Sequence, residues 1–151
     1  MKPPLSLRRE HEELHADLAR AGQAPGRIGE AARAVARIMH PHFLREDEYA
    51  IPPLALLPRL AKGQVTPDMA EVLPLVARLK EELPVMIEEH RAILGAVREL
   101  AVAAETENDE PYIRLAAALM VHAQLEEEVL YPAAILVGEY VKLKLPQPVR
   151  V

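Results

Sequence analysis

The sequence predicts an all-α protein that folds as an up-down-up-down antiparallel four-helix bundle with an internal pseudo-two-fold repeat. Apolar residues recur at alternating steps of three and four along four long segments, which is typical of helices that bury one face. Hydrophobic residues make up 50% of the chain and aromatic residues only 3%, so the core must be aliphatic. The alternating, turn-punctuated pattern of β-strands is missing. A length of 151 residues suits one domain, which we expect to span residues 1–151.

The first helix is expected over about residues 5–22 and the second over about residues 26–50. Gly22 and the QAPG segment after it end the first helix. Pro41 lies inside the second helix, but the apolar stripe continues on both sides of it, so we expect a kink rather than an end. The Pro-Pro pair at residues 52–53 closes this helix. The two stripes consist of Leu7, His11, Leu14, Leu18 and Ala21, and of Ile28, Ala32, Val35, Met39, His42, Glu46 and Tyr49.

The third helix is expected over about residues 67–104 and the fourth over about residues 109–141. A Thr-Pro-Asp run at residues 66–68 is a strong helix-start signal. Pro74 and Pro84 lie within the third helix, which is therefore expected to be bent or locally broken. The remaining features are a short apolar helical turn at residues 54–62, the loop ETENDEP at residues 105–111, a candidate kink at Pro132 and a loosely held tail at residues 145–151.

Charge and composition exclude several classes of protein. The formal net charge is −5 and the basic residues alternate with acids, which argues against a nucleic-acid-binding surface. No cysteine is present, so thiol chemistry, disulfides and zinc-finger ligation are excluded. The first residues have no apolar signal region and no apolar run approaches membrane-spanning length. We therefore expect a cytoplasmic protein with neither nucleic acid nor a membrane as a partner.

Six polar residues occupy stripe positions that otherwise hold Leu, Val, Ile, Met or Ala, and so should point into the core. An ionised carboxylate left unpaired there would cost several kcal/mol or take up a proton. Metal ions would satisfy all six groups together, while a hydrogen-bonded polar cluster without metal is the alternative. The six candidate ligands are His11, His42, Glu46, His90, His122 and Glu126.

The six residues belong to an internal repeat. The pattern H-x-x-x-E-[DE]-E-x-x-x-P occurs at His42 and again 80 residues later at His122, and in each copy the His and Glu share one helix face. The segment REHEEL around His11 is similarly matched by EEHRAI around His90, 79 residues later. Two such halves, related by a pseudo-two-fold axis, would meet at one site. This is the geometry of a dinuclear centre with two bridging carboxylates.

These motifs resemble the hemerythrin-like, or HHE cation-binding, domain family over nearly the whole chain, from about residue 5 to residue 140. The resemblance rests on E-H-x-x-L at His11, H-F-x-x-E-D at His42, E-H-x-x-I at His90, and H-x-x-x-E-E followed by L-Y-P at His122. It implies a four-helix bundle with two iron ions, each held by histidines, bridged by the two glutamates and by an oxo or hydroxo group. It also implies open positions for O2, NO or peroxide.

The chain departs from the oxygen-carrying members of that family at one position. Those proteins have a second His four residues before the third-helix His, where this sequence has Met86. Reversible oxygen carriage is therefore less expected than sensing, redox or peroxide chemistry. His15, one turn after His11, is a possible fifth histidine ligand, although we expect it to be a neighbour whose loss leaves both metals bound.

Other polar residues near the motifs are expected to lie outside the site. We expect His40 on the surface and Tyr49 and Tyr131 capping the core with their hydroxyls outward, although either could hydrogen-bond an oxygen species. Six further acids are expected on solvated faces, with a supporting role for Asp47 or Glu127 as a minority interpretation: Glu10, Asp47, Glu48, Glu89, Glu127 and Glu128.

The resulting hypothesis is a small di-iron protein that binds, senses or reacts with O2, NO or peroxide. One alternative is a peroxidase or a repair enzyme that uses the same centre, although the related iron–sulfur repair proteins carry a cysteine-bearing segment that is missing here. A bundle with a purely structural metal is another. Because His and carboxylate also bind manganese and zinc, ligand type leaves the metal open, and the sequence leaves turnover and oligomeric state open.

Overall fold

The computed structural model describes residues 1–146, and every regular element within them is helical. This confirms the predicted all-α class. The end of the predicted domain and most of the predicted loose tail, residues 147–151, lie outside the described residues. No helix within residues 1–146 is both long and apolar enough to cross a bilayer, and the cytoplasmic location stays a prediction.

The long helices agree with the predicted segments to within a few residues at most ends. Helix α1 spans Leu5–Ala21, and α2 spans Gly26–Arg45 and continues without a break into a π-helical turn, η1, at Glu46–Ala50. A 3₁₀ turn at Pro52–Leu56 and the short helix α3 at Leu57–Ala61 lead to a second 3₁₀ turn at Pro67–Glu71. Helix α4 spans Val72–Thr106. The last helical run consists of α5 at Glu110–Leu125, the π-turn η4 at Glu126–Leu130 and α6 at Tyr131–Lys144.

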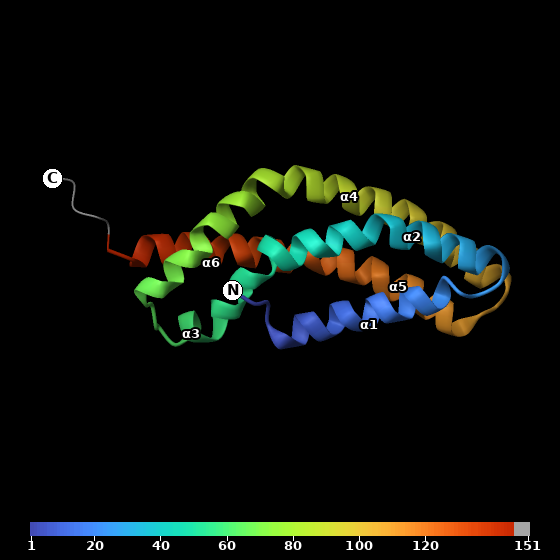
Figure 1. Ribbon diagram of the computed structural model, residues 1–151, viewed down its shortest axis with the longest axis horizontal. Coiled ribbons are helices and arrows are strands. Elements are labelled where there is room, and N and C mark those ends of the chain that lie inside the picture. The colour runs from blue at the N-terminus through green and yellow to red at the C-terminus, as the bar shows by residue number, and fades with distance from the viewer. Residues whose placement is uncertain (147–151) are drawn as a thin grey trace.

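Prolines inside the long helices do not end them, whereas the Pro-Pro pair at residues 52–53 follows the end of the second helical run at Ala50, as predicted. Pro41 lies inside α2 and Pro84 inside α4, and both helices are continuous through these positions. Helix α4 bends along its course, as predicted, but it is not broken (Figure 1). The last run extends to Lys144, three residues beyond the predicted end, with Lys142 and Lys144 in a terminal turn where cations favour the helix dipole.

The helices surround a common core along the long axis of the molecule. Helix α1 packs against α2 and α5, α2 packs against α4, and α4 packs against α5 and α6. Successive long runs lie alongside one another and reverse at short connections, with the α1–α2 and α4–α5 turns at one end and α3 at the other (Figure 1). This arrangement brings residues of α1, α2, α4 and α5 to the same depth.

Two apolar clusters of the core are separated by a polar layer. One cluster includes Met39, Phe43, Ile93 and Leu119, and the other includes Tyr49, Met86 and Tyr131. On α2, α4 and the last helical run, the predicted ligands lie between residues of these two clusters in the sequence. The apolar side chains therefore enclose the polar groups from both ends, and each fully buried Val, Leu, Ile, Phe or Met stabilises the fold by about 1.5–3 kcal/mol.

Candidate metal centre

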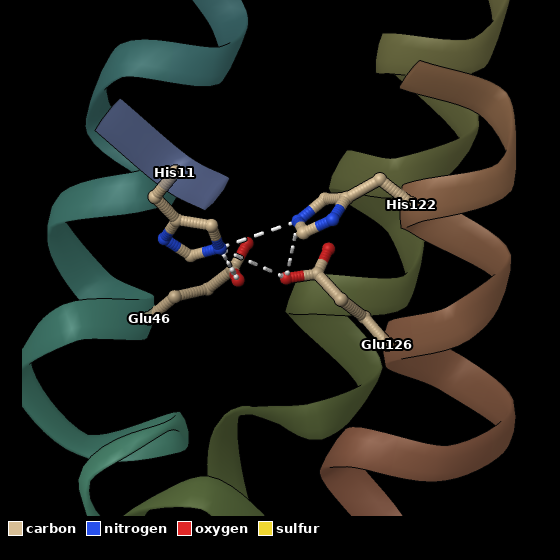
Figure 2. A group of neighbouring side chains, drawn as sticks. All are labelled: His11, Glu46, His122 and Glu126. Carbon is tan, nitrogen blue, oxygen red and sulfur yellow. Dashed lines mark hydrogen bonds and ion pairs between the residues drawn. The ribbon is translucent and has the colours of Figure 1, made fainter. Parts of the chain in front are cut away.

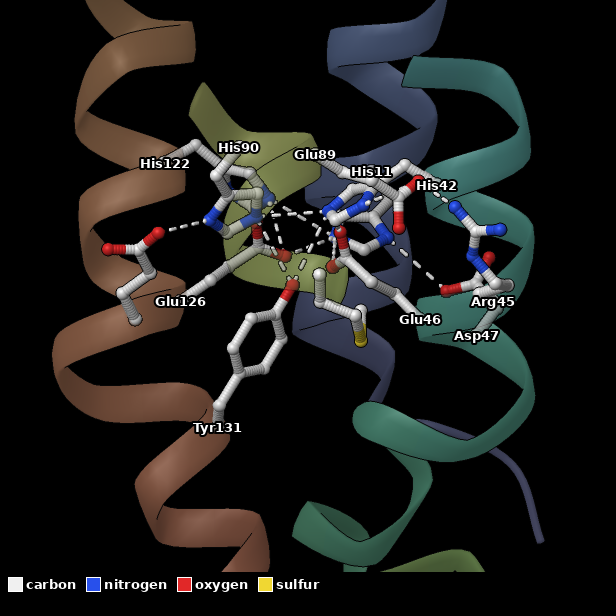
Figure 3. A network of polar contacts seen from close by, with 12 residues as sticks. His11, His42, Arg45, Glu46, Asp47, Glu89, His90, His122, Glu126 and Tyr131 are labelled. Carbon is white, nitrogen blue, oxygen red and sulfur yellow. Dashed lines mark hydrogen bonds and ion pairs between the residues drawn. The ribbon is translucent and has the colours of Figure 1, made fainter. Parts of the chain in front are cut away.

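All six predicted ligands are buried and converge at one depth of the bundle. His11 comes from α1, His42 from α2, His90 from α4 and His122 from α5, so each of these helices contributes one imidazole (Figure 3). The two glutamates open the π-turns: Glu46 is the first residue of η1 and Glu126 the first of η4.

The histidines form two pairs. The Nε2 atoms of His11 and His122 lie 3.2 Å apart, and those of His42 and His90 lie 3.0 Å apart. Two nitrogens bound to one ion at about 2.1 Å each, at tetrahedral or octahedral angles, would lie roughly 3.0–3.4 Å apart. Both pairs therefore have the spacing of two ligands on one metal ion. We call them the first pair and the second pair.

Each glutamate presents one oxygen to each pair. Oε2 of Glu46 lies 3.5 Å from Nε2 of His11 in the first pair, while its Oε1 faces Nε2 of His42 in the second. Oε2 of Glu126 lies 3.3 Å from Nε2 of His122, and its Oε1 lies 3.2 Å from Nε2 of His90 (Figure 2 shows the first pair). Each pair together with both carboxylates forms a group whose ligand atoms all lie within 4.8 Å of one another. Two carboxylates are thus placed to bridge two ions.

The π-turns at the glutamates have a cause in the sequence. Proline has no N–H, and in an α-helix its ring collides with the carbonyl four residues earlier. Pro52 and Pro132 each follow a bridging glutamate by six residues, and the preceding residue donates its N–H back to that glutamate's carbonyl, Ile51 to Glu46 at 3.0 Å and Tyr131 to Glu126. At Pro132 the widened turn lets the helix continue into α6, whereas at Pro52 the helical run ends and a 3₁₀ turn begins. Such turns are often found at functional sites.

The electrostatics of the six groups call for a cation. Both oxygens of Glu46 and Oε2 of Glu126 are buried and make no hydrogen bond. Burial and the neighbouring Glu126 hold the pKa of Glu46 well above its ordinary value. Burial alone would raise the pKa of Glu126 too, but its contacts with Glu46 and the facing imidazoles hold that pKa well below the ordinary value. Without metal, the pair therefore retains one proton, and divalent ions would satisfy the oxygens that have no partner.

The histidines differ in their readiness to lose a proton. Burial, only partly opposed by Glu126, lowers the pKa of His42 from 6.5 to about 4, so its imidazole is neutral at pH 7. Burial also acts to lower the pKa values of His90 and His122, but contacts with Glu126 outweigh it and raise both. Because only an unprotonated nitrogen binds metal, protons held by these two residues would compete with ions entering the site.

A second carboxylate lies behind each imidazole, facing its Nδ1 atom. Asp47 Oδ1 lies 3.2 Å from Nδ1 of His11, and Glu127 Oε1 lies 2.9 Å from Nδ1 of His90. Glu10 contacts Nδ1 of His122 in the same way. Glu89, which is bound to Arg45, lies 3.8 Å from Nδ1 of His42, beyond hydrogen-bond distance (Figure 3). A carboxylate in this position orients a metal-binding imidazole and makes it a stronger donor.

These four carboxylates correct the expectation that they lie on solvated faces. Asp47 and Glu127 remain half-open to solvent, yet their carboxylates contact the ligand histidines of a neighbouring helix. The signal in the sequence was their placement. Glu10 and Glu89 each precede a ligand His, while Asp47 and Glu127 each follow a bridging Glu, so both halves of the repeat carry the same pair of acids.

Replacing Asp47 with asparagine is expected to weaken metal binding by about 10–100-fold, because His11 loses the carboxylate that orients it and raises its basicity. The fold should be unaffected, since Asp47 lies at the surface. Competition with a chelator of known affinity measures the change. Glu48→Gln is the matched control: it removes the adjacent surface carboxylate, which binds Arg78 at 2.7 Å, and should leave metal affinity unchanged. Equal affinity in Asp47→Asn and wild type would exclude this role.

The tyrosines also differ from the prediction, because neither hydroxyl points outward. The Tyr131 hydroxyl lies 3.2 Å from Nε2 of His90 and 3.4 Å from Nε2 of His42, beside the second pair. The Tyr49 hydroxyl donates to Sδ of Met86 at 3.5 Å inside the core. Burial and the two nearby glutamates raise the pKa of Tyr131, so it stays protonated and can donate a hydrogen bond. The residue equivalent to Tyr131 in the first half is Ile51, so this position supplies a hydroxyl to the second pair and none to the first.

The first pair has a different neighbour. Phe43 stacks on the ring of His11 with ring centroids 4.6 Å apart, while its equivalent in the second half is Ala123. His15 is not among the two groups of facing ligands found within residues 1–146. Its side chain is exposed and faces His40, also exposed as predicted. The structure thus brings together the six predicted ligands, while His15, the possible additional ligand, lies outside the group.

Comparison with known proteins identifies one family. The family described as the hemerythrin HHE cation binding domain matches residues 5–134, a range that includes all six buried polar residues. No match was found among curated proteins or among solved structures.

Proposed function

The chain belongs to the hemerythrin HHE cation-binding domain family, and we propose that it is a non-haem di-iron protein that binds, senses or reacts with O2, NO or peroxide. The observation that carries the proposal is that Glu46 and Glu126 each give one oxygen to each histidine pair. Two bridging carboxylates and four imidazoles match the donors that iron accepts. Iron would supply redox change and coordination positions for the small ligand.

We further propose that the helices form an up-down-up-down antiparallel four-helix bundle. In this bundle, α2 and η1 count as one helix, and α5, η4 and α6 together count as another. The reversal of successive runs in Figure 1 supports this arrangement. In this arrangement each half of the chain is a pair of helices. The first helix of the pair carries one imidazole, and the second carries an imidazole and a carboxylate. The bridging site then lies on the pseudo-two-fold axis.

The number of donors favours a reactive centre over a structural metal. Each group offers four protein atoms, two nitrogens and two carboxylate oxygens. Metal ions that prefer six ligands keep open positions in such a group, whereas structural sites are usually closed by protein ligands. The two apolar clusters on either side exclude bulk water from these positions. A small molecule is the ligand that this enclosed space would admit.

Tyr131 favours peroxide chemistry as the second candidate function. Its hydroxyl is the proton-bearing group beside the second pair, at 3.2 Å from His90 Nε2, and it has no counterpart beside the first. A hydroxyl in that place can donate a hydrogen bond to an oxygen species bound at the second position. The protein would then be an enzyme in which a ferrous pair would supply the two electrons that reduce peroxide, and Tyr131 would donate a hydrogen bond to the oxygen species.

Metal content tests the proposal. Protein purified from iron-replete cells should hold two iron ions per chain, and the oxidised form should absorb in the near ultraviolet as a bridged ferric pair does. The reduced form should change its spectrum with O2, NO or peroxide. A folded, metal-replete preparation with one tightly bound ion per chain would contradict the dinuclear centre, and two zinc ions without iron would contradict the redox role.

A further inference from the structure

Two exposed histidines outside the central site face each other across α1 and α2. Nε2 of His15 lies 3.2 Å from Nδ1 of His40, and the two ring centroids are 5.3 Å apart. This separation equals the 3.2 Å between the Nε2 atoms of the first pair and is close to the 3.0 Å of the second. It also falls in the range of roughly 3.0–3.4 Å for two nitrogens on one ion. The two rings thus already have the spacing of a bidentate metal ligand.

The histidines stand in a groove between α1 and α2 with a volume of about 490 Å³. Phe43 and His11 also line this groove, so it extends from the exposed pair to a ligand of the first central pair. Two acids, Glu12 and Asp47, and one base, Arg8, line it as well. Glu12 lies three residues before His15 on the same side of α1 and lines the same groove.

The other half of the repeat shows that the pair is not required by the fold. The equivalent groove, between α4 and α5, has a smaller volume of about 280 Å³. The residues equivalent to His15 and His40 in this groove are Leu94 and Met120, both of which line it. The same position in the bundle therefore accepts an apolar pair, and the two imidazoles are a feature of the first half alone.

We propose that His15 and His40 form a second, exterior site for one divalent transition-metal ion, with water completing the coordination. Imidazole nitrogens suit zinc, copper, nickel and iron rather than calcium or magnesium. The acids of the groove outnumber its single base, which favours a cation. This site uses none of the six central ligands, so it stands whether or not the centre holds iron.

The test is a calorimetric titration with Ni²⁺ of the holoprotein, whose central site is already filled. Wild type should bind one further equivalent. His15→Ala and His40→Ala should each weaken that binding by about tenfold or more, because each removes one of two nitrogen donors. Both variants should keep the central metals and the spectrum of the oxidised form, since neither residue faces the central groups. Met120→Ala, at the equivalent position in the second groove, is the matched control and should bind Ni²⁺ like wild type.

Two outcomes would overturn the proposal. The first is no extra equivalent in wild type. The second is an extra equivalent that His15→Ala and His40→Ala both retain at wild-type affinity, which would place it elsewhere on the surface. The converse experiment adds support: Leu94→His combined with Met120→His should create a further Ni²⁺ equivalent at the matching groove. The spectrum of the central site reports whether each variant is folded.

Discussion

Replacing Glu126 with glutamine is expected to remove tight metal binding from both histidine pairs at once. Oε2 of this residue faces His122 in the first pair and Oε1 faces His90 in the second, so one substitution deprives both positions of an anionic donor. Metal content should fall from two ions to fewer than one per chain. Loss of a carboxylate that only supports a ligand typically weakens metal binding by about 10–100-fold. The loss here should be larger, because Glu126 is proposed to bind metal directly. Elemental analysis after dialysis against a weak chelator measures it.

Two variants make the result specific. Glu128→Gln removes a carboxylate two residues further on, which is exposed and accepts a hydrogen bond from Gln124 at 2.8 Å, and should keep two ions. His122→Ala removes a ligand of the first pair alone, so the second position should keep measurable affinity. Retention of two tightly bound ions in Glu126→Gln would show that this carboxylate does not bridge.

The all-helical class and the burial of the six candidate ligands could be predicted because both are recorded in the burial pattern of single helices. A stripe that steps by three and four assigns each position to the core or the surface without reference to any other helix. His90, between Met86 and Ile93 on one stripe, could only be buried, and a buried His needs a partner. The repeat at 79–80 residues then related the two halves.

The supporting carboxylates could not be predicted in this way because their contacts cross between helices. Glu10 reaches His122 from α1, and Glu89 on α4 faces His42 on α2. These acidic residues lie at the edge of a helix face, where a long side chain can point to solvent or to a neighbouring helix. The outcome depends on the rotation and spacing of two packed helices, which no single stripe specifies.

The π-turns and Tyr131 were missed for a related reason. A proline in a helical pattern predicts a kink or the end of the helix, whereas a widened turn is a third way for a helix to accommodate it. The widened turn changes the direction of every side chain after it. Tyr131 follows η4 directly, and its hydroxyl points into the site rather than outward.

Removal of the metals is expected to lower the stability of the protein, and the loss should be greater at pH 8.5 than at pH 6.5. The metal-free site leaves Glu46 and Glu126 facing each other in an apolar core, where one of them must hold a proton. The pKa of Glu46 is raised in the folded state. Its contribution to the free energy of unfolding is therefore present below pH 4.5, the ordinary pKa, and is lost as the pH rises through the raised pKa. The raised pKa values of His90 and His122 act in the same direction, their contributions being lost as pH rises above 6.5.

Two other groups act in the opposite direction under acidic conditions. The pKa of His42 is lowered to about 4, so its contribution is present above 6.5 and is lost as pH falls toward 4. Glu126, whose pKa is lowered, loses its contribution as pH falls below 4.5. The metal-free protein should therefore be most stable in mildly acidic solution. Each unit of difference between folded and unfolded pKa corresponds to about 1.4 kcal/mol.

Thermal melting of the metal-free and metal-bound forms between pH 5.5 and 8.5 measures these effects. The metal-bound form should melt at a higher temperature throughout, with the largest gap at pH 8.5, because binding of ions to the folded state alone adds stability. In metal-free Glu46→Gln, the buried carboxyl no longer titrates, so the decline above pH 6.5 should be smaller and the melting temperature at pH 8.5 higher than in metal-free wild type. A metal-free wild type that melts at the same temperature at pH 6.5 and 8.5 would show that Glu46 is not a buried, proton-holding carboxyl.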